Sequence, residues 1–118
     1  MEDQKKFEQL SGEFEVVQQS MQKHIESRQK LEAQLQENLI VEDEFKSVKD
    51  DAKVYKLTGP VLVPQSIDEA KSNVEKRLEF IRGQISTVEE EVASLQKQAE
   101  DKRDQLLALR AKLQAPPS

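Results

Sequence analysis

Cysteine and tryptophan are both absent from this chain of 118 residues. Without cysteine the chain has no disulfide framework, which fits a reducing compartment. Aromatic residues make up only 4% of the sequence, while hydrophobic and charged residues are nearly balanced at 36% and 35%. This balance is too thin for a globular core of this length, but it is typical of a long helix or a coiled coil.

Long apolar runs and long basic runs are absent as well. No apolar run approaches the roughly 20 residues that span a bilayer, and residues 1–6 lack the apolar core of a secretory signal. The net charge of −5 gives no attraction to nucleic acid or to an anionic membrane. We therefore expect a soluble, intracellular, single-domain protein without nucleic-acid or membrane partners. We expect it in the cytoplasm, and a nuclear pool stays open.

Motifs of catalysis and of cofactor binding are missing too. The sequence has no glycine-rich phosphate loop, no nucleophile beside a base and no cluster of metal ligands. Its one histidine, His24, has no second histidine or cysteine with which to hold a transition metal, so it should be partly buried and bonded to a neighbour. We expect no enzyme, no cofactor and no metal site.

A short β-rich stretch stands between two long helical segments. Two apolar runs flank Thr58-Gly59-Pro60 and predict a β-hairpin over residues 54–63. Gly59 can take a positive φ and Pro60 lacks a donor, so the strand should break there. One isolated hairpin is marginal in water and has two unpaired edges. We therefore predict that it requires strands from other chains.

The first helix is predicted over residues 4–48. Its apolar residues recur at steps of three and four, the spacing of a heptad with apolar a and d positions: Phe7, Leu10, Phe14, Val17, Met21, Leu31, Leu35 and Phe45. The same frame puts His24, Arg28, Asn38 and Glu42 on these seam positions, where polar residues help to fix the register. Near the hairpin, Leu39, Ile40 and Val41 widen the stripe. They form either a second contact surface or packing against the chain's own hairpin.

The second helix is predicted over residues 66–113. Ser66-Ile67-Asp68-Glu69 matches a capping box at its start. Its seam continues to the end of the segment: Ile67, Ala70, Val74, Leu78, Ile81, Ile85, Val88, Val92, Leu95, Ala99, Lys102, Leu106, Leu109 and Leu113. Phe80 lies off this stripe and joins residues 39–41 as a candidate assembly surface. Residues 114–118 contain two prolines and are predicted to be disordered.

Equal helical segments on either side of a turn predict an antiparallel pair. The predicted fold class is therefore mostly α, a long antiparallel two-helix coiled coil with one central β-hairpin. In this register Phe7 and Leu10 come near Leu109 and Leu113, and Arg28 comes near Glu89 or Glu91.

These two helical segments around Tyr55–Val63 resemble the prefoldin family, and the single hairpin resembles its β class. The run Arg28–Asn38 strengthens the resemblance, which covers nearly the whole chain. The departures are Pro64, expected to shorten strand pairing, and the Pro116-Pro117 tail. The resemblance implies a heterohexamer of α- and β-type subunits whose hairpins join into β-barrels. It also implies an ATP-independent chaperone that holds unfolded actin and tubulin and passes them to the cytosolic chaperonin.

Two surfaces are predicted to carry this function. The assembly surface comprises the hairpin and its helical neighbours: Val54, Tyr55, Leu57, Gly59, Pro60, Val61, Leu62, Val63, Leu39, Ile40, Val41 and Phe80. The client surface lies at the tip, where the seam ends and helices fray: Phe7, Leu10, Leu107, Leu109 and Leu113. The alternative is a passive scaffold or adaptor coiled coil, which would need a fixed partner with an apolar groove.

Overall fold

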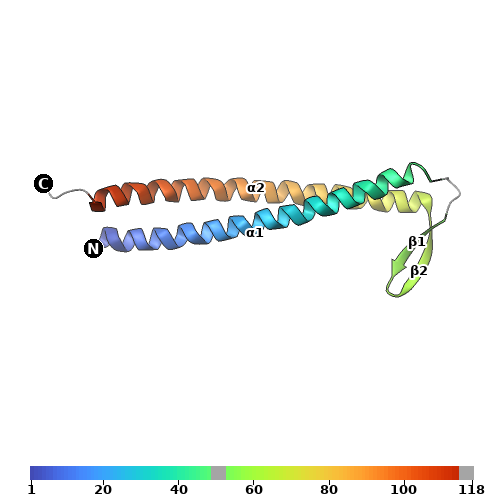
Figure 1. The fold of residues 1–118 in the computed structure, drawn as a ribbon, viewed down its shortest axis with the longest axis horizontal. Coiled ribbons are helices and arrows are strands. Elements are labelled where there is room, and N and C mark those ends of the chain that lie inside the picture. The colour runs from blue at the N-terminus through green and yellow to red at the C-terminus, as the bar shows by residue number, and fades with distance from the viewer. Residues whose placement is uncertain (49–52, 115–118) are drawn as a thin grey trace. The chain divides into compact units, whose positions relative to one another are not determined.

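The computed structural model describes residues 1–48 and 53–114. The elements follow in the order α1 (Glu2–Phe45), β1 (Lys53–Thr58), β2 (Val61–Ser66) and α2 (Ile67–Gln114), as Figure 1 shows. The predicted fold class, mostly helical with a single hairpin between two long helices, is confirmed. No helix in the described ranges combines the length and the apolar character that a membrane span requires.

The chain divides into two compact units, which we describe separately. Unit 1 contains Met1–Arg28 and Thr87–Ser118, and unit 2 contains Gln29–Ser86. In unit 1 the buried apolar residues are Leu10, Val17 and Ala99. In unit 2 they all come from α2: Ile67, Ala70, Val74, Leu78, Ile81 and Ile85. These residues are seam positions of the predicted heptads, so the apolar periodicity identifies the core of each unit.

The first helix ends three residues earlier than predicted, at Phe45 rather than at residue 48. Beyond Phe45 the amides of Lys46, Ser47 and Val48 donate to carbonyl oxygens three residues back, at 3.1, 3.2 and 3.3 Å. This tighter pattern satisfies the last carbonyls of a helix and terminates it. Disorder was predicted for residues 114–118, but Gln114 is the last residue of α2, and residues 115–118 lie outside the described residues.

The hairpin is antiparallel, with Thr58 opposite Val61 at the turn and Lys53 opposite Ser66 at the far end. Gly59 has a φ of 59°, and no other residue in the described part of the chain has a positive φ. A positive φ at the first turn position, followed by proline at the second, is the pattern of a type II′ turn. Its twist matches that of the flanking strands, so Gly59-Pro60 selects a tight hairpin.

The second strand is longer than predicted. We expected the hairpin to end at Val63 and Pro64 to shorten the pairing, but β2 continues through Pro64, opposite Tyr55, as far as Ser66. Each strand of a two-stranded sheet is an edge strand. An edge strand accommodates proline where the missing N–H would face away from the partner strand. The proline therefore leaves the hairpin intact.

The start of α2 follows the predicted capping pattern. Ser66 closes β2, and its Oγ accepts a hydrogen bond from the backbone N–H of Glu69 at 3.1 Å. This bond satisfies one of the amides that the first turn of a helix leaves without a partner. Ser66 thus joins the strand directly to the helix, with no intervening loop.

Candidate functional site: exposed apolar surfaces

The hairpin presents two faces of different character. Alternate residues of a strand point to opposite sides, so the pairs Tyr55–Pro64 and Leu57–Leu62 share one side, which we call the Leu57 face. All four residues are apolar in body and exposed: Tyr55 is 57% exposed, Leu57 68% and Leu62 61%. These two pairs form an apolar patch that is open to water and ready to be covered, while the third pair that the register assigns to this side, Lys53–Ser66 at the far end, consists of polar residue types.

The opposite side, which we call the Lys56 face, mixes polar and apolar residues. It consists of Val54, Lys56, Thr58, Val61, Val63 and Gln65. Val61 and Val63 are exposed, and Val54 is half-buried. Gly59 and Pro60, also predicted for the assembly surface, lie exposed in the turn between the faces. The sequence alone identified the apolar residues of the hairpin, and the strand register sorts them onto two faces.

Three predicted helical neighbours of the hairpin are also exposed. Ile40 of α1 is 60% exposed, Val41 is 37% exposed, and Phe80 of α2 is 65% exposed, while Leu39 is half-buried. Packing against the chain's own hairpin was the alternative explanation for residues 39–41, and the 60% exposure of Ile40 argues against it for that residue. Ile40 and Phe80 remain candidates for contacts with other chains.

In unit 1 the predicted client residues differ in their availability. Leu107 is 55% exposed and Leu113 45% exposed, while Phe7 and Leu109 are half-buried. Leu10 is only 8% exposed and belongs to the core of this unit, so it offers no surface while the two helices are packed. It falls on a seam position, which explains why it is covered.

Two exposed apolar residues of unit 1 were not predicted as client residues. Val16 is 63% exposed and Met1 is 99% exposed. Val16 stands beside the buried Val17 and off the seam, as Leu107 stands beside the seam residue Leu106. The position of Val16 off the heptad stripe was therefore the feature of the sequence that would have identified it as exposed.

Polar seam residues link the two helices of unit 1. His24 lies between the backbone carbonyl oxygen of Ser20, 2.7 Å from Nδ1, and Oε2 of Glu91, 2.7 Å from Nε2. Arg28 donates from Nε and Nη2 to Oε1 of Glu89, at 3.1 and 2.9 Å. The predictions of a bonded, partly buried His24 and of an Arg28–Glu89 contact are confirmed. These pairs favour the antiparallel register over a shifted one.

Two further ion pairs of unit 1 follow the same register. Lys112 Nζ lies 3.1 Å from Oδ2 of Asp3, and Lys102 Nζ donates to Oε2 of Glu13 at 3.0 Å. The hydrogen bond and the charge of Lys102, together with a hydrogen bond from Gln9, hold the pKa of the Glu13 carboxyl below its ordinary value. Lys102 thus occupies a predicted seam position but serves as an ion-pair partner.

Replacing Lys102 by methionine should raise the pKa of Glu13 toward its ordinary value, because the largest cause of the lowering is removed. A carboxyl whose pKa is lowered by folding adds stability above its unfolded pKa, and that stability disappears as the pH falls through the folded pKa. Carbon NMR of the Glu13 carboxyl across an acid titration measures the change. Lys97→Met, which removes an exposed lysine elsewhere on α2, is the control and should leave Glu13 unaltered. Identical titration of Glu13 in wild type and Lys102→Met would contradict the assignment.

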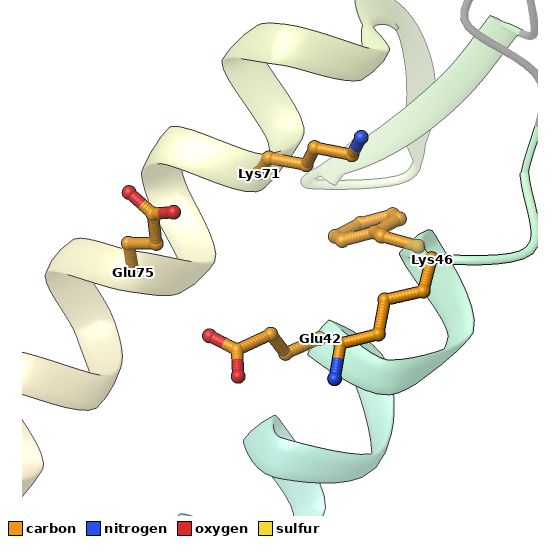
Figure 2. Close-up of a pocket in the computed structure, with 5 residues that line it drawn as sticks. Glu42, Lys46, Lys71 and Glu75 are labelled. Atoms are coloured by element: carbon orange, nitrogen blue, oxygen red, sulfur yellow. The ribbon is translucent and has the colours of Figure 1, made fainter.

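A hollow of mixed charge in unit 2 separates the end of α1 from the first turns of α2. Glu42 and Phe45 of α1 line it together with Lys46, which directly follows the helix, and Lys71 and Glu75 line it from α2. Figure 2 shows the amines of Lys46 and Lys71 pointing to opposite sides of this hollow. Lys46 pairs with Asp43, near the end of α1, at 3.6 Å. The hollow brings together no nucleophile and base, and the described residues contain no group of carboxylates and histidines arranged to hold a metal.

Comparison with known proteins gives one family. The family model described as "Prefoldin subunit" matches residues 8–115. Prefoldin subunit 6 of Saccharomyces cerevisiae is 44% identical over 100 residues, covering 85% of this chain and 88% of its own. Prefoldin subunit 6 of Homo sapiens is 39% identical over 111 residues, covering 94% and 86%. The crystal structure of the prefoldin beta subunit from Thermococcus strain KS-1 is 25% identical, covers 95% of each chain and superposes with a TM-score of 0.82.

Proposed function

This chain belongs to the prefoldin family, and from that premise we propose that it is the β-type subunit of a heterohexameric co-chaperone. Prefoldin subunits are non-enzymatic and assemble as hetero-oligomers with other prefoldin subunits. The resemblance to the prefoldin family and its β class, predicted from Arg28–Asn38 and Tyr55–Val63, is confirmed, and the yeast and human relatives are both subunit 6 proteins. The proposed complex holds unfolded polypeptides such as actin and tubulin without ATP and transfers them to the cytosolic chaperonin. Its proposed location is the cytoplasm.

One observation supports this proposal above the others, the apolar and exposed Leu57 face of the hairpin. A single chain leaves Leu57, Leu62 and Tyr55 more than half exposed to water. Within residues 1–48 and 53–114, it also leaves the outer edges of both strands without a pairing strand, since the sheet there consists of β1 and β2. Strands from other subunits would cover the face and pair the edges at once. The hairpin is thus well suited to intersubunit assembly.

Measuring the molar mass by light scattering tests the assembly. The chain is measured alone, and again after mixing with α-type and other β-type prefoldin subunits. We expect a small species to convert into one defined complex of about six chains, the number that the family resemblance implies. A stable monomer that ignores the other subunits would contradict the proposal.

Client binding is proposed at the exposed apolar residues near the ends of both helices in unit 1. Leu107 and Leu113 of α2 supply exposed apolar surface. Phe7 of α1 and Leu109 of α2 are half-buried, and the Asp3–Lys112 ion pair sets an antiparallel register in which these two residues face each other. Each contact of this kind is weak. Several subunits that bind one unfolded chain together gain through effective concentration, without a strict sequence preference.

Replacing Leu107 and Leu113 by serine should weaken the suppression of client aggregation by the assembled complex. We expect about a thirtyfold higher complex concentration to be needed, since each of the two lost leucine contacts removes on the order of 1 kcal/mol. Light scattering of denatured actin diluted into the complex measures the effect.

Ala108→Ser with Ala111→Ser is the matched control, because both residues are exposed neighbours on the same helix and carry little apolar surface. Equal protection by the two double variants would place the client site elsewhere. Failure of the wild-type complex to hold any unfolded client would instead favour the scaffold or adaptor function.

A further inference from the structure

Unit 2 has an exposed arginine without a carboxylate partner. Arg77 of α2 donates from Nη1 to Oδ1 of Asn38 on α1 at 3.5 Å. Within residues 1–48 and 53–114 it forms no ion pair. Arg28 of unit 1, by contrast, donates two hydrogen bonds to Glu89, at 3.1 and 2.9 Å. Since a guanidinium has five N–H donors, Arg77 keeps most of its donors available to another chain.

Two apolar residues lie on the same side of unit 2 as Arg77. Arg77 directly precedes the seam residue Leu78, and Val41 directly precedes the seam residue Glu42, and both of these seam residues begin a three-residue step of the heptad. Equivalent heptad positions of an antiparallel helix pair flank the same side of the seam, so Arg77 and Val41 share a side. Phe80 joins them, because residues three apart on a helix are neighbours.

The bond between Asn38 and Arg77 also sets the register of the two helices. Val41 and Phe80 each lie three residues from this level, in opposite directions along the helix axis, which separates them by about 9 Å at 1.5 Å per residue. Val41 is 37% exposed and Phe80 is 65% exposed. Arg77, Val41 and Phe80 therefore form one surface, which we call the Arg77 patch, with a cation between an aliphatic and an aromatic side chain.

We propose that the Arg77 patch binds a helix of a neighbouring prefoldin subunit. A carboxylate of that helix accepts hydrogen bonds from the Arg77 guanidinium, and apolar side chains beside it pack against Phe80 and Val41. This inference rests on the proposed function, since the partner is a subunit of the same assembly. Charge complementarity selects the carboxylate, and the planar fork of arginine binds it with two parallel hydrogen bonds. Arginine and aromatic residues are also enriched among the residues that dominate interface energies.

The position of the patch selects a subunit, and not an unfolded client, as its occupant. The Arg77 patch belongs to unit 2, which also contains the hairpin and its Leu57 face. The exposed residues proposed for clients, Leu107 and Leu113, belong to unit 1. In this fold α2 follows β2 without a loop. An assembly through hairpins therefore brings the adjoining helices of two subunits together as well.

Arg77→Gln tests the charge, because glutamine still has an N–H to donate to Asn38 but no positive charge. Arg82→Gln is the matched control: Arg82 is exposed on the same helix, and it follows the seam residue Ile81, which puts it on the opposite side of the seam. With the complete set of prefoldin subunits, we expect Arg77→Gln to weaken incorporation about tenfold and Arg82→Gln to leave it unchanged. Raising NaCl from about 0.05 M to about 0.5 M should narrow this difference, since salt screens the ion pair. Equal incorporation of the two variants at low salt would overturn the proposal.

Replacing Phe80 by the photoreactive p-benzoylphenylalanine identifies what covers the patch. The substitution keeps an aromatic side chain at an exposed position, so the fold of the chain should be retained. After illumination of the assembled complex, we expect a cross-link to a helical residue of another prefoldin subunit, within about one turn of an aspartate or glutamate. A cross-link to a hairpin strand, a cross-link only to added unfolded actin, or none at all would overturn the inference while assembly itself stands. If wild type formed no complex, the proposed function would fail first, and the absence of a mass increase would identify that case.

Discussion

Replacing Leu57 and Leu62 by lysine is expected to abolish incorporation of this chain into a prefoldin complex. The two residues oppose each other on the Leu57 face, where they are 68% and 61% exposed in the single chain. Under the proposed function this face becomes buried against other hairpins. A lysine buried there without a counter-charge costs several kcal/mol, and each 1.4 kcal/mol weakens association tenfold. We expect assembly to weaken by roughly 100-fold or more, measured by light scattering or native mass spectrometry.

The neighbouring pair on the other face provides the control. Thr58→Lys with Val61→Lys places the same two charges opposite each other, one residue closer to the turn and on the Lys56 face. Repulsion across the strands, worth up to about 1 kcal/mol, is then common to both double variants. The control should still assemble, because its lysines remain in water beside Lys56. Normal assembly of the Leu57/Leu62 variant would exclude the Leu57 face from the subunit interface. Equal loss of assembly in both double variants would mean that the Leu57 face is no more important for assembly than the Lys56 face.

Leu78→Ala is expected to cause the largest loss of stability among single substitutions in the core of unit 2. Leu78 is the most deeply buried residue, at 1% exposure, and its seam neighbours Val74 and Ile81 are 6% and 3% exposed. Truncating such a leucine removes its transfer free energy and leaves a cavity, at a combined cost of about 3 kcal/mol. Urea unfolding of the assembled complex, followed by far-UV circular dichroism, should show a clearly lower midpoint.

Leu107→Ala makes the same chemical change on the same helix at a residue that is 55% exposed. It should alter the free energy of unfolding by less than about 1 kcal/mol, because little surface is uncovered and no cavity forms. The difference between the two variants therefore measures burial and not helix propensity. A Leu78 variant as stable as the Leu107 variant would show that the seam of unit 2 relaxes around the lost side chain.

Most of the architecture was predictable from short-range patterns. The heptad spacing located both helices and their buried residues, from Leu10 and Val17 in α1 to Leu78 and Ile81 in α2. Gly59-Pro60 located the turn, and Ser66 with Glu69 located the start of α2. Each of these signals depends on the backbone preference of a few adjacent residues or on a repeat along one helix, so it can be read without knowing the partner.

The candidate surfaces were predictable only in outline. The sequence marked the hairpin residues, Ile40, Phe80 and Leu107 as apolar and out of pattern, but it included the buried Leu10 and left out the exposed Val16. It also ended the hairpin at Val63, before the strand that continues through Pro64. Whether an apolar side chain remains in water depends on the segment that packs against it. In this chain that segment is far away in the sequence.

Two elementary properties thus account for different parts of the molecule. Backbone preference and apolar repeat are properties of neighbouring residues, and they suffice to specify two helices, a tight turn and an antiparallel arrangement. The turn then fixes the strand register, which separates the Leu57 face from the Lys56 face. Side-chain coverage arises only when segments far apart in the sequence meet: the tertiary structure buries Leu10 and leaves Val16 in water, because the burial of a side chain depends on the segment that packs against it.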